Sequence, residues 1–150
     1  MPLEVRVTLP AGIDSAAALL SEELGNGLRD AGMAIENEAK HLVPVRTGNL
    51  RRSIMSSVET LGGTQTGIVA AQAGYGRYVE SGTKPHTPPL SAIATWANRK
   101  GLPAGAIWMA IRKKGTKAHP FMAPALEAKR SVVIDTVQEA IKTFVARVIG

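Results

Sequence analysis

The chain contains no cysteine, which excludes disulfides, thiolate metal sites and a cysteine nucleophile. Only six residues are aromatic, and the first is Tyr75, so the N-terminal half must pack with aliphatic side chains. No apolar run reaches the length of a membrane span, and the first residues lack the basic flank and apolar block of a signal peptide. We therefore expect a soluble protein that is made in a cytoplasm.

Motifs that carry known chemistry are also absent. No stretch matches a phosphate-binding loop, a dinucleotide-binding fingerprint or a nucleophile elbow. The histidines His41, His86 and His119 lack the spacing of metal ligands, and Glu59 and Glu80 are the only carboxylates between residues 39 and 126. Glu80 is better explained as an ion-pair partner than as a catalytic acid. We therefore expect no enzyme, no metal and no cofactor.

The length and composition fit a single globular domain, and the charge is unevenly spread along it. Of the 150 residues, 45% are hydrophobic and 20% are charged, which is ordinary globular usage. The net charge of +6 divides into −4 for residues 1–45, +9 for residues 46–120 and +1 for residues 121–150. This pattern suits head-to-tail association or a surface turned toward a polyanion, and a solvated basic loop is the simpler alternative.

The first third predicts a strand and then a long helix. Residues 3–9 alternate between apolar and polar side chains, and Pro10 and Gly12 end this strand. Asp14 can cap a helix over residues 15–42, and Pro44 stops it. Three helix glycines either permit close packing or mark a bend: Gly25, Gly27 and Gly32. The apolar stripe of the helix comprises Leu20, Leu24, Leu28, Ala31, Ile35, Ala39 and Leu42.

The next segment predicts a helical turn and a β-hairpin. Thr47 can cap a short helical turn in which Leu50 is the buried anchor. Residues 54–61 and 66–72 predict two strands, with Gly62 and Gly63 in the turn between them. Residues 75–83 fit either a strand or a helical turn.

Residues 84–118 have the character of an insertion. A proline-rich entry leads into a helix over residues 90–100 that ends at Gly101, and Pro103 starts a second helix that ends at Gly115. A last helix starts with Pro124 at its first position, and its apolar stripe comprises Leu126, Val133, Val137, Ile141, Val145 and Val148. The predicted class is α+β: two long helices packed on a small antiparallel sheet, with a helical insertion.

The basic residues fall into two groups that could meet phosphates, an acidic protein or only water. The first group is Arg46, Arg51 and Arg52, and the second is Arg99, Lys100, Arg112, Lys113, Lys114 and Lys117. No helix-turn-helix or RNA-recognition signature accompanies them, and the aromatic residues are too few for a stacking platform. A small basic nucleic-acid-binding protein remains the alternative to a structural protein.

Four strings resemble the head–tail joining or tail-completion proteins of long-tailed double-stranded DNA phages, also known as neck or minor tail proteins. They lie in the family's order at residues 39–45, 47–54, 75–83 and 120–125. Arg46 stands where the family often has an acidic residue, and Gly76 stands where it often has alanine. The resemblance frames residues 15–150 of what we treat as a single domain, residues 1–150, with the insertion at 84–118.

The resemblance implies a ring, expected to be six-fold, between the connector or stopper and the tail terminator or tail tube. DNA passes through its lumen without sequence-specific binding, and no active site is implied. The expected place is the neck of the virion, after synthesis in the bacterial host cytoplasm.

Roles follow for three sets of residues. The architectural set is Pro44, Thr47, Gly48, Leu50, Ser53, Ile54, Tyr78, Glu80, Gly82, Thr83, Pro120, Phe121 and Pro124. The expected subunit or partner contacts are Arg46, Arg51, Arg52, Trp96 and Trp108. The second basic group is expected to face the lumen or a partner. Among the architectural residues, Gly82 is expected to need a positive φ, which glycine takes at the least cost.

Overall fold

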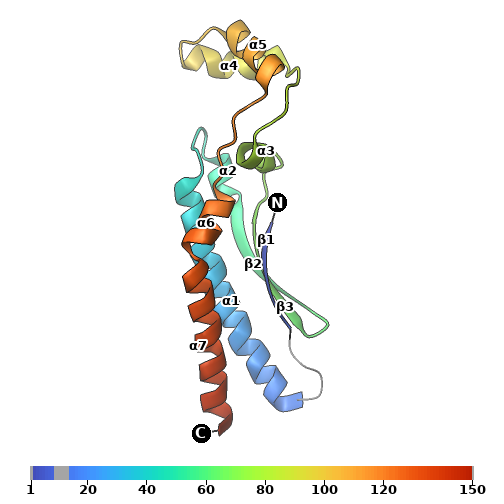
Figure 1. Cartoon of the computed structure of the whole chain (residues 1–150), viewed down its shortest axis with the longest axis vertical. Coiled ribbons are helices and arrows are strands. Elements are labelled where there is room, and N and C mark those ends of the chain that lie inside the picture. The colour runs from blue at the N-terminus through green and yellow to red at the C-terminus, as the bar shows by residue number, and fades with distance from the viewer. Residues whose placement is uncertain (1, 9–13, 150) are drawn as a thin grey trace. The chain divides into compact units, whose positions relative to one another are not determined.

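The computed structural model describes residues 2–8 and 14–149. They divide into two units, one made of Met1–Gly76 with Pro120–Gly150 and the other of Arg77–His119 (Figure 1). The predicted turn at Pro10 and Gly12 lies outside the described residues, as does the side chain of Asp14.

The first unit contains a three-stranded antiparallel sheet in the order β1-β3-β2. Its strands are β1 (Leu3–Thr8), β2 (Ile54–Leu61) and β3 (Thr64–Ala71). The predicted hairpin is confirmed, and Gly62 and Gly63 take φ values of 56° and 77°, as a two-residue turn of this hand requires. Because the hairpin closes directly after these glycines, β3 begins at Thr64 and not at residue 66.

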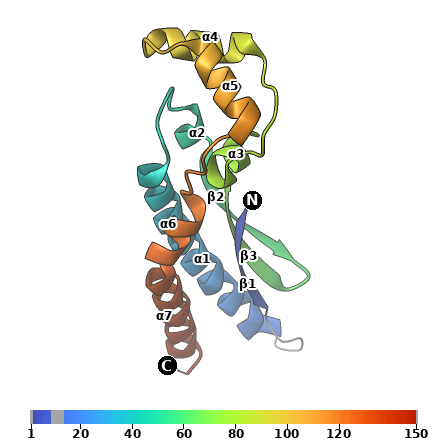
Figure 2. The ribbon, with the colours of Figure 1, turned by 45° about the horizontal axis from the view of Figure 1, so that its top comes forward.

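One face of this sheet is covered by α1 (Asp14–Leu42), an unbroken helix of 29 residues (Figures 1 and 2). Most of its predicted apolar stripe is buried: Leu24, Leu28, Ala31, Ile35 and Ala39. The alternation of β3 matches it, since Gln65, Gly67 and Val69 are buried on the same sheet face. The predicted long helix and its register are therefore confirmed.

Glycines of α1 lie at its close contacts. A Cβ atom on Gly25 would lie 3.0 Å from Oε1 of Gln65, and one on Gly32 would lie 3.1 Å from Cβ of Ser56. These small residues let the helix backbone approach the sheet, so close packing is the explanation that the structure supports.

The C-terminal part is two helices, α6 (Met122–Ala128) and α7 (Arg130–Ile149), where the sequence predicted one. The break lies at Lys129, which has φ −105° and ψ 9°. Pro124 is the third residue of α6 and not the first, a position whose N–H has no partner within the helix, so proline is tolerated there.

α7 packs along α1 (Figures 1 and 2), and its buried face differs from the predicted stripe. At the contact, Gly27 of α1 would place a Cβ atom 3.0 Å from the carbonyl oxygen of Thr136 and 3.3 Å from Cβ of Ala140. The close approach buries the small Ala140, whereas the predicted core residues Ile141, Val145 and Val148 are 45%, 43% and 50% exposed. Packing against α1 alone therefore covers only part of the apolar surface of α7.

The end of α1 also differs from the prediction. Leu42 is 43% exposed, and Val43 is buried at 3%. Val43 lies four residues after Ala39 and donates its backbone N–H to the Ala39 carbonyl at 2.9 Å. The buried stripe of α1 therefore continues from Ala39 to Val43, which lies one residue beyond the end of the helix.

The described residues also form four further short helices. α2 (Asn49–Arg52) and the hairpin belong to the first unit, and α3 (Gly76–Ser81) starts at the boundary between the units. Residues 75–83, open at the level of sequence, are thus mainly helical. α4 (Leu90–Arg99) and α5 (Ala104–Lys114) form the predicted helical insertion, and Figure 2 shows the short turn that joins them. The predicted α+β class is confirmed.

Candidate partner-binding surfaces

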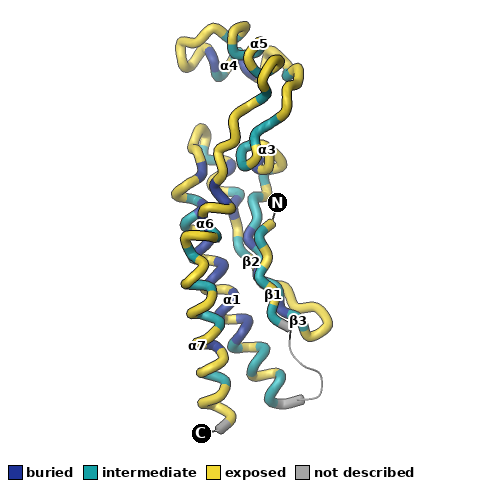
Figure 3. The backbone as a smooth tube through the Cα atoms, in the orientation of Figure 1, coloured by how far each residue is buried: buried dark blue, intermediate teal, exposed yellow. Residues whose placement is uncertain are grey.

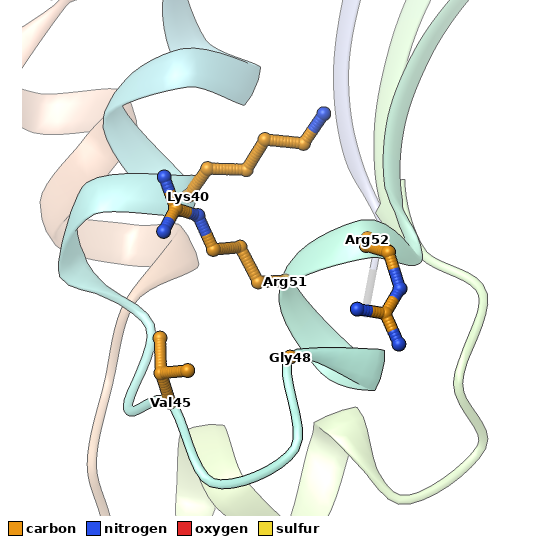
Figure 4. Close-up of a pocket in the computed structure, with 5 residues that line it drawn as sticks. All are labelled: Lys40, Val45, Gly48, Arg51 and Arg52. Atoms are coloured by element: carbon orange, nitrogen blue, oxygen red, sulfur yellow. The ribbon is translucent and has the colours of Figure 1, made fainter.

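A basic hollow of about 390 Å³ lies in the first unit, between the end of α1 and α2 (Figure 4). Its lining residues are Lys40, Val45, Gly48, Arg51 and Arg52. The Arg51 side chain reaches from α2 toward the last turn of α1, while the end groups of Lys40 and Arg52 point away from each other. Side chains of three basic residues from two helices therefore line one open volume.

Gly48 shapes this hollow and starts α2. It is the residue before the first helical turn, with φ 78° and ψ −4°, and no side chain caps the helix. The predicted Thr47 cap is therefore wrong, because Gly48 intervenes and Thr47 is exposed. A Cβ atom on Gly48 would lie 3.0 Å from Nη1 of Arg52, so a larger residue would displace that guanidinium.

The guanidinium of Arg52 is also oriented by its own helix. Its Nη2 donates to Oδ1 of Asn49 at 2.5 Å. The missing side chain of Gly48 leaves room for the guanidinium, and Asn49 fixes its orientation. The Arg52 side chain is nevertheless exposed.

Lys40 is held by an ion pair that also ties α1 to the sheet. Its Nζ lies 2.5 Å from Oε1 of Glu36, and Oε2 of Glu36 accepts 2.7 Å hydrogen bonds from the backbone N–H and the hydroxyl of Ser56. Burial acts to raise the pKa of Glu36, but the bonds from Lys40 and Ser56 outweigh it and hold that pKa below its usual value. Glu36 therefore stays charged and fixes Lys40 at the edge of the hollow.

Arg46 and Arg51 differ from these two cations. Both are exposed, and neither side chain has a hydrogen bond or an ion pair within residues 2–8 and 14–149. Next to them Val45 is 62% exposed. The hollow thus combines uncompensated positive charge with an apolar side chain.

In the second unit, α4 and α5 form a small helical hairpin. Ile93 and Ala97 of α4 are buried, and both tryptophans, Trp96 and Trp108, are half-buried. Figure 3 shows that exposed residues make up most of this unit. The indole N–H of Trp108 donates to the carbonyl of Pro88 at 2.8 Å, and the Arg112 guanidinium lies 5.4 Å from its ring centre. Trp108 therefore has a packing role inside its own unit, and its role as a contact to another subunit stays a prediction.

The second unit also concentrates the positive charge. Residues 77–119 hold eight basic side chains and one acidic side chain, a net charge of +7, whereas the remaining residues together have a net charge of −1. All six residues of the predicted lumen-facing or partner-facing group lie in this unit and are exposed: Arg99, Lys100, Arg112, Lys113, Lys114 and Lys117. The +9 segment read from the sequence is therefore divided, because Arg46, Arg51 and Arg52 belong to the first unit.

A two-stranded stem closes the insertion at its base. Thr83 and Thr116 exchange both backbone hydrogen bonds, at 3.1 and 3.2 Å, and their hydroxyl oxygens are 3.0 Å apart. Gly82 has φ 69°, as predicted, and a Cβ atom there would lie 2.4 Å from the Thr116 carbonyl oxygen. On the other strand, Gly115 would place a Cβ atom 1.8 Å from the Thr83 carbonyl oxygen.

Three members of the architectural set are buried, and for Leu50 this burial was predicted. Leu50, Ile54 and Phe121 are 5%, 0% and 1% exposed. Ser53 donates its hydroxyl to the Leu50 carbonyl at 2.8 Å, which closes α2.

Other members of that set lie at the surface. Pro44, Pro120 and Pro124 are exposed, and Glu80 is half-buried. Tyr78 is 46% exposed, and its ring lies 4.5 Å below the Arg77 guanidinium, which also bonds its hydroxyl. Their roles stay predictions.

Sequence reasoning missed the polar contacts between α1 and the sheet. Gln65 is 4% exposed and donates its amide to the Ser21 carbonyl at 2.5 Å. Glu36 with Ser56 is the second such contact. Alternation in β3 placed Gln65 on the inward face, which was the available signal, but nothing in the sequence pairs Glu36 with a serine 20 residues away.

Neither a membrane-spanning helix nor a cluster of metal ligands occurs among the described residues. No helix there combines the length and apolar character needed to cross a membrane. Within the same residues, no three His, Cys, Asp or Glu side chains are grouped so that they could hold a metal ion.

A family model described as "Bacteriophage HK97-gp10, putative tail-component" matches residues 8–82, half of the chain. The chain belongs to this family. Neither a curated protein nor a solved structure matches it. The HK97-gp10-like family is one of structural tail components, so the expected family and non-enzymatic role are confirmed.

The matched stretch has clear structural limits. It covers α1, α2, the β2–β3 hairpin and α3, so every residue that lines the basic hollow lies inside it. It ends at Gly82, where the stem of the insertion begins. As an HK97-gp10-like tail component, the chain is a virion protein whose partners include other virion proteins.

Proposed function

We propose that this protein forms a ring in the phage neck that joins the tail to the head connector and lets DNA pass. Its membership of a phage tail-component family is the observation that carries the proposal. The two units also offer chemically different surfaces, because one has a net charge of +7 and the other −1. Unlike surfaces favour contacts between different patches of neighbouring copies, and such contacts form a ring when the rotation between copies closes.

The proposed assembly has several partners. They are further copies of the chain in a six-fold ring, the connector or stopper on the head side, and the tail-terminator or tail-tube protein on the tail side. In this proposal residues 1–150 act as one tail-completion domain with the insertion at 84–118, made in the bacterial cytoplasm and incorporated into the neck.

Two groups of residues have distinct roles in the proposal. Arg46, Arg51 and Arg52, with Trp96 and Trp108, contact neighbouring subunits or partners, where arginine and tryptophan are favoured contact residues. The exposed cations of the second unit face the lumen or a partner. DNA that slides through the lumen is not gripped tightly, because many simultaneous phosphate contacts would slow its passage.

Loss of the protein in the phage that encodes it tests the proposal. Electron microscopy should then show filled heads and complete tails that are not joined, and a plasmid copy should restore joining. A plasmid copy with Arg51→Glu and Arg52→Glu should restore it poorly, whereas Lys113→Glu with Lys114→Glu should act more mildly. Joined particles in the absence of the protein would contradict the proposal.

A small basic nucleic-acid-binding protein is the second candidate, favoured by the eight basic side chains of the second unit. Fluorescence anisotropy with duplex DNA, over a range of salt concentrations, separates the two. A neck protein should bind weakly at physiological salt, with Kd in the non-specific range of about 10⁻⁴–10⁻⁶ M. Binding about a thousandfold tighter would favour the second candidate.

A further inference from the structure

We infer that the basic hollow receives the acidic outer face of α1 from a second copy of this chain. The acidic outer face comprises Leu19, Glu22, Asp30 and Met33. The inference deepens the proposed function, on which it rests, because it names the two surfaces through which neighbouring copies in a ring would meet.

The hollow has binding capacity that its own chain does not use. Glu36 neutralises Lys40, and Asn49 orients Arg52 without neutralising it. Arg51 has no side-chain partner in the part of the chain that the structure describes, and it lines the same 390 Å³ volume. The guanidinium groups of Arg51 and Arg52 can therefore each donate further hydrogen bonds. A carboxylate can accept two parallel hydrogen bonds from one planar guanidinium group.

The acidic outer face supplies such acceptors. Three carboxylates of α1 are engaged inside the chain: Glu23 with Arg147 at 2.7 Å, Glu36 with Lys40, and Glu38 with Lys129 at 3.1 Å. Glu22 and Asp30 are exposed and have no ion pair among the described residues.

The four residues of this face lie on one side of the helix. At 3.6 residues per turn, positions 19, 22, 30 and 33 fall within an arc of about 80°. Leu19 and Met33 are 37% and 46% exposed, so apolar groups flank the two carboxylates. Asn26 lies within the same arc and accepts a hydrogen bond from the exposed Arg29, so the face offers two carboxylates and apolar contacts with one cation at its margin, as the hollow offers arginines and Val45.

Geometry excludes a contact within one chain. Asp30 and Lys40 belong to the same unbroken helix and are separated along its axis by about 15 Å at the standard rise. A rigid helix cannot fold its own face into a hollow at its own end. In our proposal a second copy supplies the face, and each copy then offers one surface to each neighbour, a head-to-tail arrangement that forms a ring when the rotation between copies closes.

The exposed Val45 favours a protein segment over DNA as the occupant. A phosphate backbone would leave this apolar side chain unmatched, whereas Met33 or Leu19 would cover it. Val45 is 62% exposed, so the gain from covering it is available to a partner.

A charge swap with a crosslinking readout tests the inference. Since the chain has no native cysteine, chains with Val45→Cys and chains with Met33→Cys, one of which carries a tag that changes its mass, can be mixed and oxidised, and the heterodimer then reports hollow-to-face contact. We expect a crosslink from the mixture. Either Arg51→Glu with Arg52→Glu, or Glu22→Lys with Asp30→Lys, should lower its yield roughly tenfold, as loss of two favourable charge pairs predicts.

Carrying all four reversals in both chains should restore the yield to within about twofold, because the charges again match. Circular dichroism of each variant checks that it is folded. Arg130→Glu with Lys142→Glu is the matched control, since it makes the same charge change on the exposed side of α7 and should leave the yield unchanged.

Three results would overturn the inference: no heterodimer at the highest soluble concentration, an unchanged yield after reversal of the acidic face, or no recovery in the fourfold variant. Loss of DNA binding in the Arg51→Glu, Arg52→Glu chain with an unchanged crosslink would assign the hollow to nucleic acid instead. If crosslinking fails but heads and tails still need the protein to join, the proposed function stands and only this contact is wrong.

Discussion

The first unit buries Leu24, Leu28 and Phe121 to 2% exposure or less, whereas α5 of the second unit, described over its full length, contains no buried residue. Apart from the buried Ile93 and Ala97 of α4, the second unit relies on a stem closed by backbone hydrogen bonds, in which two glycines let the two segments approach closely. Burial of apolar surface is the main stabilising contribution in the first unit, whereas backbone geometry and local contacts contribute more in the second unit.

The two units differ in net charge as well as in apolar burial. A unit that buries little apolar surface keeps most of its side chains in solvent, and here those side chains are mainly basic. The first unit can offer a fixed surface such as the basic hollow, since Gly48, Asn49 and Glu36 orient the residues around it. Mutations that separate the two kinds of stabilisation sharpen the comparison.

The largest effect is expected in the first unit, from Leu50→Ala. Leu50 is 5% exposed and anchors α2, so its truncation should lower the free energy of unfolding by about 2–5 kcal/mol. Urea denaturation followed by circular dichroism measures the change. Leu102→Ala, at a side chain 46% exposed, is the control, and equal midpoints for wild type and Leu50→Ala would contradict the anchor assignment.

A more local effect is expected from Gly115→Ala in the stem. Gly115 has φ 75° and ψ −159°, a region that is essentially limited to glycine and costs other residues about 1–3 kcal/mol. The added Cβ atom would also meet the Thr83 carbonyl oxygen at 1.8 Å. Hydrogen exchange should accelerate at the Thr83 and Thr116 amides while α1 keeps its protection.

Gly105→Ala is the matched control for that change. Gly105 lies in α5, and a Cβ atom there would meet nothing within 4 Å. It should slightly stabilise the helix, by up to about 1 kcal/mol. Unchanged exchange at the stem in Gly115→Ala would show that backbone closure does not hold the second unit.

Glu36→Gln should lower stability at neutral pH by roughly 1–2 kcal/mol, since it weakens charge-assisted hydrogen bonds from Lys40 and Ser56. The pKa of Glu36 is lowered by folding, so its stabilisation is present above the unfolded pKa and is lost as the pH falls through the folded pKa. Thermal unfolding from about pH 7 to pH 3 should show the two proteins converging at acid pH.

Glu22→Gln is the control, because it removes the same charge from α1 without touching Ser56. A constant difference between wild type and Glu36→Gln across the whole pH range would contradict the role given to the charged form.

The smallest effect is expected from Trp108→Phe. It removes the indole N–H that donates a hydrogen bond to the Pro88 carbonyl, so the second unit should lose about 0.5–1.5 kcal/mol of stability.

A fluorescence measurement tests whether Trp108 also contacts a neighbouring subunit. In a Trp96→Phe chain Trp108 is the one remaining tryptophan, and its emission should shift to the blue on assembly if it makes that contact. An unchanged spectrum in assembled protein would limit Trp108 to its internal role.

Much of the fold follows from local patterns in the sequence. The alternation in residues 3–8, the row from Leu24 to Ala39 and the Gly62-Gly63 turn each act over a few neighbouring residues, so they predict β1, α1 and the hairpin. The positive φ at Gly82 and the burial of Leu50 were predicted for the same reason. The break at Lys129, the exposure of Ile141 and the buried Ala140 were not, because they depend on how closely α1 and α7 approach at Gly27.

The candidate surfaces divide in the same way. By itself the sequence determined that the chain is basic in its middle, lacks catalytic and metal-binding motifs and resembles phage tail-completion proteins, because composition and short strings are local properties. The tertiary structure decided which of those charges act together. It assigned Arg51 and Arg52 to a different unit from the cations of the insertion, brought Lys40 to the same hollow, and placed Gly115 against Thr83, 32 positions earlier in the chain. Such groupings arise only when distant segments pack, and no spacing along the chain encodes them directly.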